Sequence, residues 1–381
     1  MDDEQEQQGL VSVLYSVHEK LRLKKRELKA DTEWQEAWES HTSDHATLQE
    51  YSKAMHALAT KIWDPRNKNI PVETDSRPKC FKSSSNNLQS VKLKCRLEWV
   101  LHCCEKYFSV DEAKEGVTLH SEQSSKLKLL DVGSCYNPFS KYGNVFDVTA
   151  VDLCPAPGFE ESIFRCDFLC LKVIGNGEVF TDVTISQFEY DQISVGSVNY
   201  RQLNSLQAGS FNVVVFSYFL EYLADPKHRL ESCQKAYKLL KPGGLLFILR
   251  PDSSKVTPGG NTRLIKMLKL GMVLLGFRRV YFEKLEHLWC MAFKKETEEY
   301  ISASIASSFF KRDVHKIGIG NIFDDRTRLH ELFYISQDLK EITSGNLQQG
   351  VSSYSSNKTE GDDSHNLLEV LPGYDDSSYN D

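Results

Sequence analysis

The stretch from Lys126 to Pro138, K-L-K-L-L-D-V-G-S-C-Y-N-P, constrains the fold more than any other part of the chain. Its first half is a short, nearly continuous apolar run, which is typical of a buried parallel strand with both faces covered. Asp131 and Gly133 end this run, and a small polar turn follows. Ligands of open α/β sheets bind beyond the carboxyl ends of the strands, and a glycine lets the backbone approach a ligand. We therefore expect a ligand at this turn.

The next strand-like runs end in side chains that can serve the same site. The second run ends at Asp152, 21 residues after Asp131. At this spacing a carboxylate can accept hydrogen bonds from the hydroxyls of a ribose. A third short run and a fourth run follow, and an apolar run after L-K-P-G-G at residues 240–244 predicts a fifth strand. The candidate site residues at the ends of the third and fourth runs are Asp167, Phe168 and Ser217.

The order of these elements predicts the fold class. The elements follow one another as in a class I S-adenosylmethionine (SAM) methyltransferase, a Rossmann-like α/β fold. In chain order they are strand-Asp-x-Gly, strand-Asp, Asp-Phe, strand, helix, L-K-P-G-G and strand. The strand-like runs Arg278–Glu283 and Leu288–Phe293 are about four residues apart and predict a C-terminal antiparallel hairpin. This hairpin, and the absence of G-x-G-x-x-G spacing, argue against a nicotinamide oxidoreductase. The remaining alternative is an α/β domain that binds no nucleoside.

Helical spacing of apolar residues precedes the predicted sheet. It predicts a small all-helical N-terminal domain over residues 9–63, with residues 1–8 disordered. Residues 64–87 are expected to form a loop, and residues 88–125 a helix that packs on the core. Arg96 lies just off the apolar face of this helix. It either reaches the crevice above the first strand or is an exposed arginine without a ligand, and the spacing leaves both open.

The methyltransferase-like domain is predicted over residues 126–342. Within it, the segment 170–210 is longer than a usual connection between strands and predicts a helix and a loop. Residues 343–381 are rich in Ser, Asn, Asp and Gly. Such a segment cannot bury enough apolar surface to offset its ordering entropy, so we expect a disordered acidic tail.

Composition narrows the class of partners and the compartment. The net charge of −7 gives no basic footprint of the kind found in proteins that bind long nucleic acids, so we expect no nucleic-acid partner. No apolar run has the length of a membrane span, and no signal or transit peptide is evident. The ten cysteines are scattered without zinc-ligand spacing, which predicts reduced thiols and no metal site. We therefore expect a cytoplasmic protein.

Several short motifs together are specific for one family. They are L-L-D-V-G-S-C-Y-N-P-F at 129–139, C-D-F-L at 166–169, V-V-V-F-S at 213–217, P-D-S-S at 251–254, H-L-W-C-M-A-F at 287–293, S-V-H-E-K-L-R at 16–22 and R-L-E-W at 96–99. With them the chain resembles the SAMTOR family of S-adenosylmethionine sensors upstream of the TOR kinase complex. That family is related to a yeast 25S ribosomal RNA adenine-N1 methyltransferase. The resemblance covers most of residues 9–295, whereas residues 296–330 do not match well.

The resemblance implies a helical N-terminal domain that closes over SAM, and S-adenosyl-L-homocysteine is also expected to bind. It implies that the SAM-free protein binds the GATOR and KICSTOR complexes and restrains TOR signalling, and that SAM releases it. It also implies association with the lysosome surface through these partners. The family's ligand residues carry over to Arg96, Gly133, Asp152, Asp167, Phe168 and Ser217.

The loop after the fourth strand bears on catalysis. Amino-methyltransferases that act on adenine often carry [DNS]-P-P-[YF] there, but this chain has S-Y-F-L at 217–220, without either proline. The similar N-P-F at 137–139 follows the first strand, at the wrong end of the cofactor. We identify no catalytic residue and expect a sensor with little or no turnover. The alternative is an active SAM-dependent adenine-N1 methyltransferase acting on ribosomal RNA.

Overall fold

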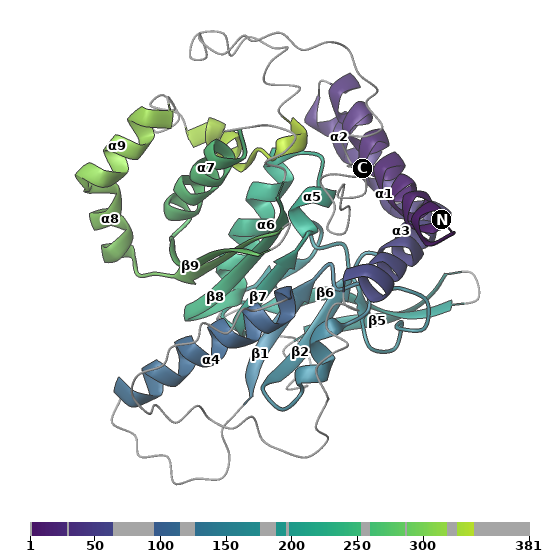
Figure 1. Cartoon of the computed structure of the whole chain (residues 1–381), viewed down its shortest axis with the longest axis horizontal. Coiled ribbons are helices and arrows are strands. Elements are labelled where there is room, and N and C mark those ends of the chain that lie inside the picture. The colour runs from purple at the N-terminus through teal and green to yellow at the C-terminus, as the bar shows by residue number, and fades with distance from the viewer. Residues whose placement is uncertain are drawn as a thin grey trace, which may run out of the picture.

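The computed structural model is organised around one ten-stranded mixed sheet with helices on both sides (Figure 1). The structure describes residues 2–28, 30–63, 95–114, 126–175, 188–195, 198–252, 260–285, 288–317 and 326–338. The loop predicted at 64–87 and the acidic tail predicted at 343–381 lie outside these described residues.

The strands lie in the order β4-β6-β3-β2-β1-β7-β8-β10-β9, and β5 pairs with β6. Their bounds are β1 Leu127–Val132, β2 Phe146–Asp152, β3 Phe164–Arg165, β4 Lys172–Ile174, β5 Phe188–Val195, β6 Val198–Gln207, β7 Phe211–Ser217, β8 Leu240–Pro251, β9 Phe277–Leu285 and β10 Leu288–Lys295. β1 is central and parallel to both neighbours, with Leu130 opposite Thr149 of β2 and Val214 of β7. β3 runs parallel to β2, so the carboxyl ends of β1, β2, β3 and β7 meet at one edge of the sheet.

The last two strands form the predicted hairpin. β10 is antiparallel to β8 on one side and to β9 on the other, with Met291 opposite Ile248 and Phe282 respectively. An antiparallel strand inserted between β8 and β9 completes the class I SAM-methyltransferase topology. The predicted fold class is therefore confirmed.

One face of the sheet is covered by α4 (Arg96–Lys114). Its buried side chains pack against apolar residues of β1, β7, β8 and β10, and include Leu97, Val100, Cys103 and Cys104. The indole of Trp99 donates to Glu283 at 2.8 Å, and the hydroxyl of Tyr107 donates to the carbonyl oxygen of Gly243 at 3.0 Å. This packing fixes the N-terminus of α4, and with it Arg96.

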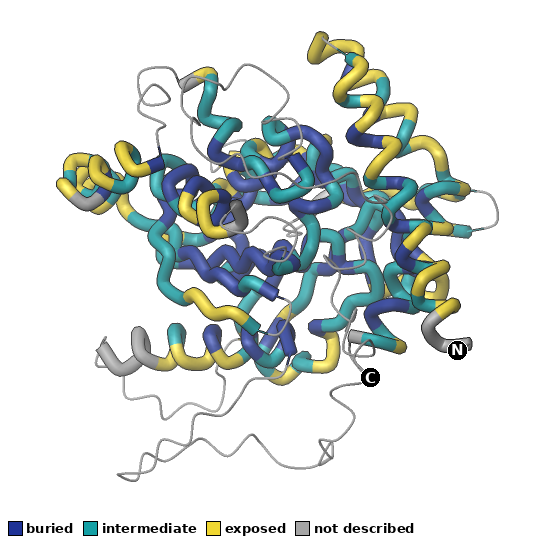
Figure 2. The backbone as a smooth tube through the Cα atoms, turned by 45° about the horizontal axis from the view of Figure 1, so that its top comes forward, coloured by how far each residue is buried: buried dark blue, intermediate teal, exposed yellow. Residues whose placement is uncertain are grey.

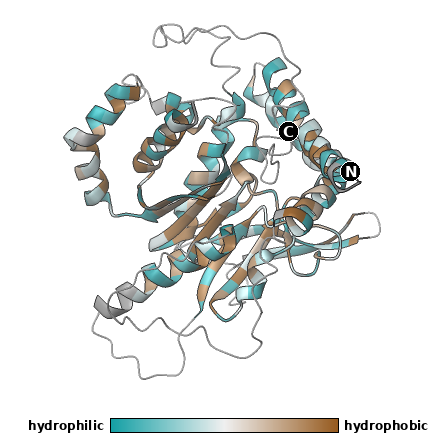
Figure 3. Ribbon diagram, in the orientation of Figure 1, coloured by the Kyte–Doolittle hydropathy of each residue, from teal (hydrophilic) through white to brown (hydrophobic). Residues whose placement is uncertain are grey.

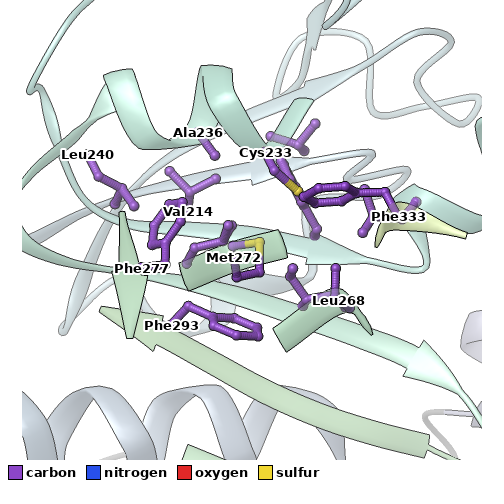
Figure 4. Packing of buried hydrophobic residues seen from close by; sticks show 14 of the residues in the cluster. Val214, Cys233, Ala236, Leu240, Leu268, Met272, Phe277, Phe293 and Phe333 are labelled. Carbon is purple, nitrogen blue, oxygen red and sulfur yellow. The ribbon is translucent and has the colours of Figure 1, made fainter. Parts of the chain in front are cut away.

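The other face is covered by α6 (Pro226–Leu239) and α7 (Gly260–Leu274). Figure 4 shows Cys233 and Ala236 of α6, and Leu268 and Met272 of α7, packed around the sheet residue Val214. Further out lie α8 (Glu298–Ala306), α9 (Ser308–Ile317) and the 3₁₀ helices η4 (Arg326–Phe333) and η5 (Ser336–Asp338). Their apolar residues join the same core and include Phe310, Ile317, Leu332 and Phe333.

Three N-terminal helices lie together at the right of Figure 1: α1 (Asp2–Glu27), α2 (Asp31–Ser43) and α3 (His45–Leu58), which continues as a π-helix, η1 (Ala59–Trp63). α1 begins seven residues before the start predicted at residue 9. α1 and α3 pack on each other through Leu14 and Leu58. Trp34 and Trp38 of α2 instead pack on Leu223 and Ala224, so α2 is attached to the α/β core.

The helix predicted within residues 170–210 is wrong for the described part of that segment. The chain there forms β4, β5 and β6, and β5 pairs with β6 from Phe188–Leu206 to Val195–Val198. Burial in β6 does not alternate regularly, since Tyr200, Leu203, Ser205 and Leu206 are the buried residues, so its pairing with β5 is what defines it as a strand. The length of the connection decided the prediction, although short β-branched and aromatic segments favour strands.

A buried ion pair attaches residues 326–338 to α6. Arg229 is fully buried and donates to both carboxylate oxygens of Asp338, at 2.5 and 3.0 Å. The same guanidinium donates to the carbonyl oxygens of Leu223 and Phe333, and Asp338 also accepts from the backbone of Ile335. Both buried charges are thus paired and hydrogen-bonded, which is the condition for burying them.

Asp338→Ala should lower the free energy of unfolding by about 3–5 kcal/mol, because it leaves the Arg229 charge buried without its partner. The control is Asp313→Ala, which removes a pair with Lys269 at 3.8 Å whose side chains are 39% and 42% exposed. That change should cost about 0.5 kcal/mol or less. Urea denaturation measures both, and equal losses would contradict a structural role for the buried pair.

Candidate functional site

A cavity of about 90 Å³ lies at the carboxyl ends of β1, β2, β3 and β7. The strand ends contribute the predicted residues Gly133, Asp152, Asp167, Phe168 and Ser217. The opposite side comes from α2 and α3, through Trp38, Leu48, Tyr51, Ser52 and Met55. The cavity is therefore enclosed between the sheet and the N-terminal helices.

A second cavity of about 30 Å³ adjoins the first. The two share lining residues, which are Met55, Gly133, Cys135, Ser217 and Tyr218. The smaller cavity is also lined by Arg96, Asp131 and Tyr136. All six residues predicted for the site thus lie around these two adjoining cavities.

The turn after β1 brings backbone close to both cavities. Gly133 has φ +73°, and a Cβ there would lie 3.4 Å from the ring of Phe219. Cys135 and Asn137 also have left-handed backbone, with φ of 59° and 53°. The turn is held by a hydrogen bond from the Cys135 backbone to the carboxylate of Asp152, at 2.9 Å.

Asp152 lies half-buried at the end of β2. One oxygen accepts from the backbone of Cys135 at 2.9 Å, and the other from the backbone of Cys154 at 2.8 Å. Burial raises the pKa of Asp152 to about 6, and the two backbone hydrogen bonds oppose that rise. Two carboxylate oxygens offer about four acceptor positions, so Asp152 can still accept from a ligand's hydroxyls.

Asp167 connects the third strand end to α2. One carboxylate oxygen accepts from the backbone of Leu169 at 2.9 Å, and the other accepts from the indole nitrogen of Trp38, also at 2.9 Å. The ring of Phe168 lies edge-on to the rings of Phe216 and Phe219. The two sides of the larger cavity are therefore hydrogen-bonded to each other at Asp167.

Two hydroxyl groups face this region without a hydrogen-bond partner among the described residues. The Oγ atoms of Ser217, at the end of β7, and Ser52, on α3, are both buried and unpaired. Buried polar groups are nearly always hydrogen-bonded, and an unpaired one is destabilising. Ser217 lines both cavities, so a polar ligand that spans them would satisfy its hydroxyl.

The smaller cavity has an acid and a cation at the same end. The guanidinium of Arg96 donates to the hydroxyl of Tyr136 at 3.0 Å and lies 5.8 Å from the centre of the Tyr218 ring. Asp131 accepts from Ser134 Oγ at 2.7 Å, and burial raises its pKa to about 7, against the opposing effects of Ser134 and Arg96. Such a pair is complementary to the ammonium and carboxylate of an amino acid.

Several residues of the site were not predicted from the sequence. Asp131 was named only as the end of a strand, and Trp38 was not singled out within the helical residues 9–63. Two histidine–tyrosine hydrogen bonds also lie beside the larger cavity: His18 with Tyr51 at 2.9 Å, and His41 with Tyr222 at 2.6 Å. Burial lowers the pKa of His18 to about 3, so this imidazole is neutral at physiological pH. His18 and Asp131 lie within the motifs quoted for the family resemblance, whereas no local motif marks Trp38, His41, Tyr51 and Tyr222, because these come from separate helices.

Two classes of feature are not found within the described ranges. No group of three or more His, Cys, Asp or Glu side chains there is arranged to hold a metal ion. None of the described helices is both long enough and apolar enough to cross a membrane.

Comparison with known proteins assigns the fold to a class and then to a family. The family described as a methyltransferase domain matches residues 108–302, so the chain has the methyltransferase fold that its topology indicates. The S-adenosylmethionine sensor upstream of mTORC1 from Xenopus tropicalis is 32% identical over 340 residues, which cover 80% of this chain and 74% of the relative. The sensor of the same name from Danio rerio is 31% identical over 324 residues, covering 76% and 71%.

At this identity and coverage, the chain belongs to the family of S-adenosylmethionine sensors upstream of mTORC1. The resemblance drawn from the sequence motifs is confirmed. Among solved structures, the N-methyltransferase NodS from Bradyrhizobium japonicum in complex with S-adenosyl-L-homocysteine is 15% identical. Its TM-score is 0.31 over 52% of this chain and 87% of that chain, which adds nothing to the assignment.

Proposed function

We propose that this protein binds SAM between the sheet and helices α2 and α3, and that SAM controls its binding to partners. One observation carries the proposal. The two adjoining cavities combine the Asp152 carboxylate, suited to a ribose, with an acid–cation pair suited to an amino acid. SAM is a nucleoside joined to an amino acid, so its two ends match the two cavities.

The nucleoside would occupy the larger cavity. Asp152 would accept hydrogen bonds from the ribose hydroxyls, each contributing about 1.5–3 kcal/mol as a charge-assisted bond. Asp167 and Phe168 would contact the adenine. Asp167 would accept from the amino group in an acceptor direction that the indole of Trp38 does not use. The carboxylate has room for both donors, because each oxygen offers more than one acceptor direction.

The methionine part would occupy the smaller cavity. Arg96 would bind the carboxylate, because a guanidinium matches that planar group with two parallel donors. Asp131 would accept from the ammonium, and the backbone at Gly133 would allow the chain to pass closely. Ser217, which lines both cavities, would lie near the sulfonium. S-adenosyl-L-homocysteine shares both ends and should bind as well.

The sensor role follows from ligand contacts on both sides of the cavity. A ligand that touches the strand ends and the helices together favours the arrangement in which both are in place. The SAM-free protein would bind the GATOR and KICSTOR complexes and restrain TOR signalling, and SAM would release it. The protein would be cytoplasmic and would reach the lysosome surface through these partners. By reciprocity, partner binding must weaken SAM binding by the same factor.

A second candidate function is methyl transfer to adenine N1 of ribosomal RNA. The methyltransferase fold favours it, whereas the chain after Ser217 does not, because Phe219–Tyr222 forms the short helix α5 rather than a proline loop. Incubation with labelled SAM and total RNA, scored as 1-methyladenosine, separates the two functions. Transfer that saturates with RNA and is lost in Asp152→Ala would favour the enzyme.

Asp152→Ala should weaken SAM binding roughly a hundredfold, because it removes two charge-assisted hydrogen bonds worth about 3 kcal/mol together. Gly133→Asp should be equally damaging through steric clash and charge repulsion. Isothermal titration calorimetry measures both. The matched control is Asp147→Ala, which removes an exposed carboxylate from the same strand and should leave the affinity unchanged. Near-normal affinity in both site variants would overturn the assignment.

SAM affinity should fall as the pH drops from 7 to 5. The form of Asp152 that accepts from the ribose is ionised, and its pKa is about 6 before SAM binds. The contribution of Asp152 is then fully developed only well above pH 6 and weakens about tenfold for each unit below it. Asp131, with a pKa of about 7, acts in the same direction. A constant affinity between pH 7 and pH 5 would contradict the role of the ionised carboxylates.

Trp38→Phe should weaken SAM binding about tenfold and reduce the effect of SAM on partner binding, because it removes the hydrogen bond to Asp167. Trp289→Phe is the matched control, since that indole donates to Asp252 at 2.9 Å outside either cavity. Hydrogen exchange gives the structural readout. SAM should slow exchange in α2 and α3 of the wild type, as well as around Gly133 and Asp152. Protection confined to the strand ends would show that the helices do not respond.

A further inference from the structure

A strongly basic face is formed by α7 and α9, away from the two cavities. The cationic side chains on these helices are Arg263, Lys266, Lys269, Lys311, Arg312 and Lys316. The described residues of α7 and α9 contain one acidic side chain, Asp313, which lies 3.8 Å from Lys269. The whole chain carries a net charge of −7, so this concentration of positive charge departs from its average composition.

The cations lie on the outer surface because the apolar residues of both helices face the core. In α9, Phe310 and Ile317 are buried, whereas Lys311, Arg312 and Lys316 are exposed. Figure 1 shows α9 outside α7, on the side opposite the N-terminal helices, and Figures 2 and 3 show exposed, hydrophilic residues along it.

The basic residues of the two helices belong to one surface. Arg263 of α7 donates to the carbonyl oxygen of Ile317 at the end of α9, at 3.1 Å. Lys266 is exposed one turn further along α7.

We propose that residues 343–381 of the same chain occupy this basic face. The segment contains seven acidic residues and one lysine, Lys358. The acidic residues are Glu360, Asp362, Asp363, Glu369, Asp375, Asp376 and Asp381. The face thus carries six cationic side chains and one acidic one, and the segment carries seven acidic side chains and one cationic one, so the two have opposite charge.

The described residues that precede the segment pack beside the face. Residues 326–338, which precede it, pack on α7: Leu332 and Phe333 belong to the same core cluster as Leu268. A Cβ on Gly271 would lie 2.8 Å from the Phe333 ring, which shows how closely this part of the chain approaches α7. From Asp338 to Glu360 the chain can span at most about 75 Å, which is ample to reach α9. An attached segment also competes at an effective concentration in the millimolar range.

The chemistry of the face favours an acidic polypeptide over a lipid bilayer. Helices that bind a bilayer insert large apolar side chains beside their basic residues. Among the side chains that the structure describes, which leave out Phe309 of α9, the exposed large apolar ones are Leu23, Tyr190, Phe282 and Tyr300, and none of these lies on α7 or α9. Bound there, the acidic segment would shield the face from other polyanions. This contact does not depend on SAM binding.

Zero-length carbodiimide cross-linking of the full-length protein tests the contact directly. We expect cross-links from Glu360, Asp362 and Asp363 to the lysines of α7 and α9, in protein of monomer mass. Their yield should fall severalfold in 0.5 M salt, because exposed charges are then screened over a few ångströms. The exposed Lys20 and Lys24 of α1 serve as internal controls and should give few links to the segment. Absence of links to α7 and α9, or links found only between two copies, would overturn the proposal.

Heparin affinity provides the second measurement. Glu360→Gln/Asp362→Asn/Asp363→Asn should raise the salt concentration for elution, because it uncovers the basic face. The control Glu36→Gln/Glu39→Gln/Glu50→Gln changes the net charge equally at exposed sites on α2 and α3 and should shift elution less. Adding Lys311→Glu/Arg312→Glu/Lys316→Glu to the segment variant should abolish its gain. Equal shifts in the segment variant and the control would show that the face is not covered.

Discussion

The carboxylate of Asp152 shapes the site, because both of its oxygens accept backbone N–H groups from turns that border the cavity. The bond from Cys135 fixes the turn after β1, in which Cys135 and Asn137 hold left-handed backbone. Such a conformation costs about 1–3 kcal/mol for a residue other than glycine. Burial of the Asp152 charge is costly as well and raises its pKa to about 6. Backbone strain and a carboxylate with a raised pKa, where they occur together, are typical of a ligand-binding site.

The two ends of the site depend on different layers of the fold. Arg96 is held by α4, which packs on one face of the sheet, whereas Trp38 is held by α2 against residues 223–224 beyond β7. Asp131 and Asp152 come from the sheet between them. A ligand in the two cavities would therefore touch the sheet, α4 and the N-terminal helices at once. This arrangement explains how a small ligand can change the relation between layers that are distant in sequence.

The sequence predicted the sheet well because β1 and β7 are buried on both faces and read as continuous apolar runs. The residues at the strand ends, such as Gly133 and Ser217, could be predicted from the same runs, since parallel strands end at one edge. The roles of Trp38 and Tyr51 could not, because their helical spacing shows which face is buried but not what that face contacts. The strands β5 and β6 were missed for a related reason: they form a local hairpin inside a connection whose length resembled that of a helix.

The short helix α5 stands where the proline-containing substrate loop is absent, and it contacts the N-terminal helices. It follows Ser217, where amino-methyltransferases that act on adenine often carry a substrate loop. Here Tyr222 packs against Tyr51 and Trp38 on the opposite side of the cavity, and the backbone of Glu221 accepts from Arg22 of α1 at 3.0 Å. The Glu221 side chain accepts from Arg250 of β8 at 2.7 Å, which fixes α5 to the sheet. To receive a base, this segment would have to give up these contacts. The residues that follow Ser217 here join the N-terminal helices to the cavity.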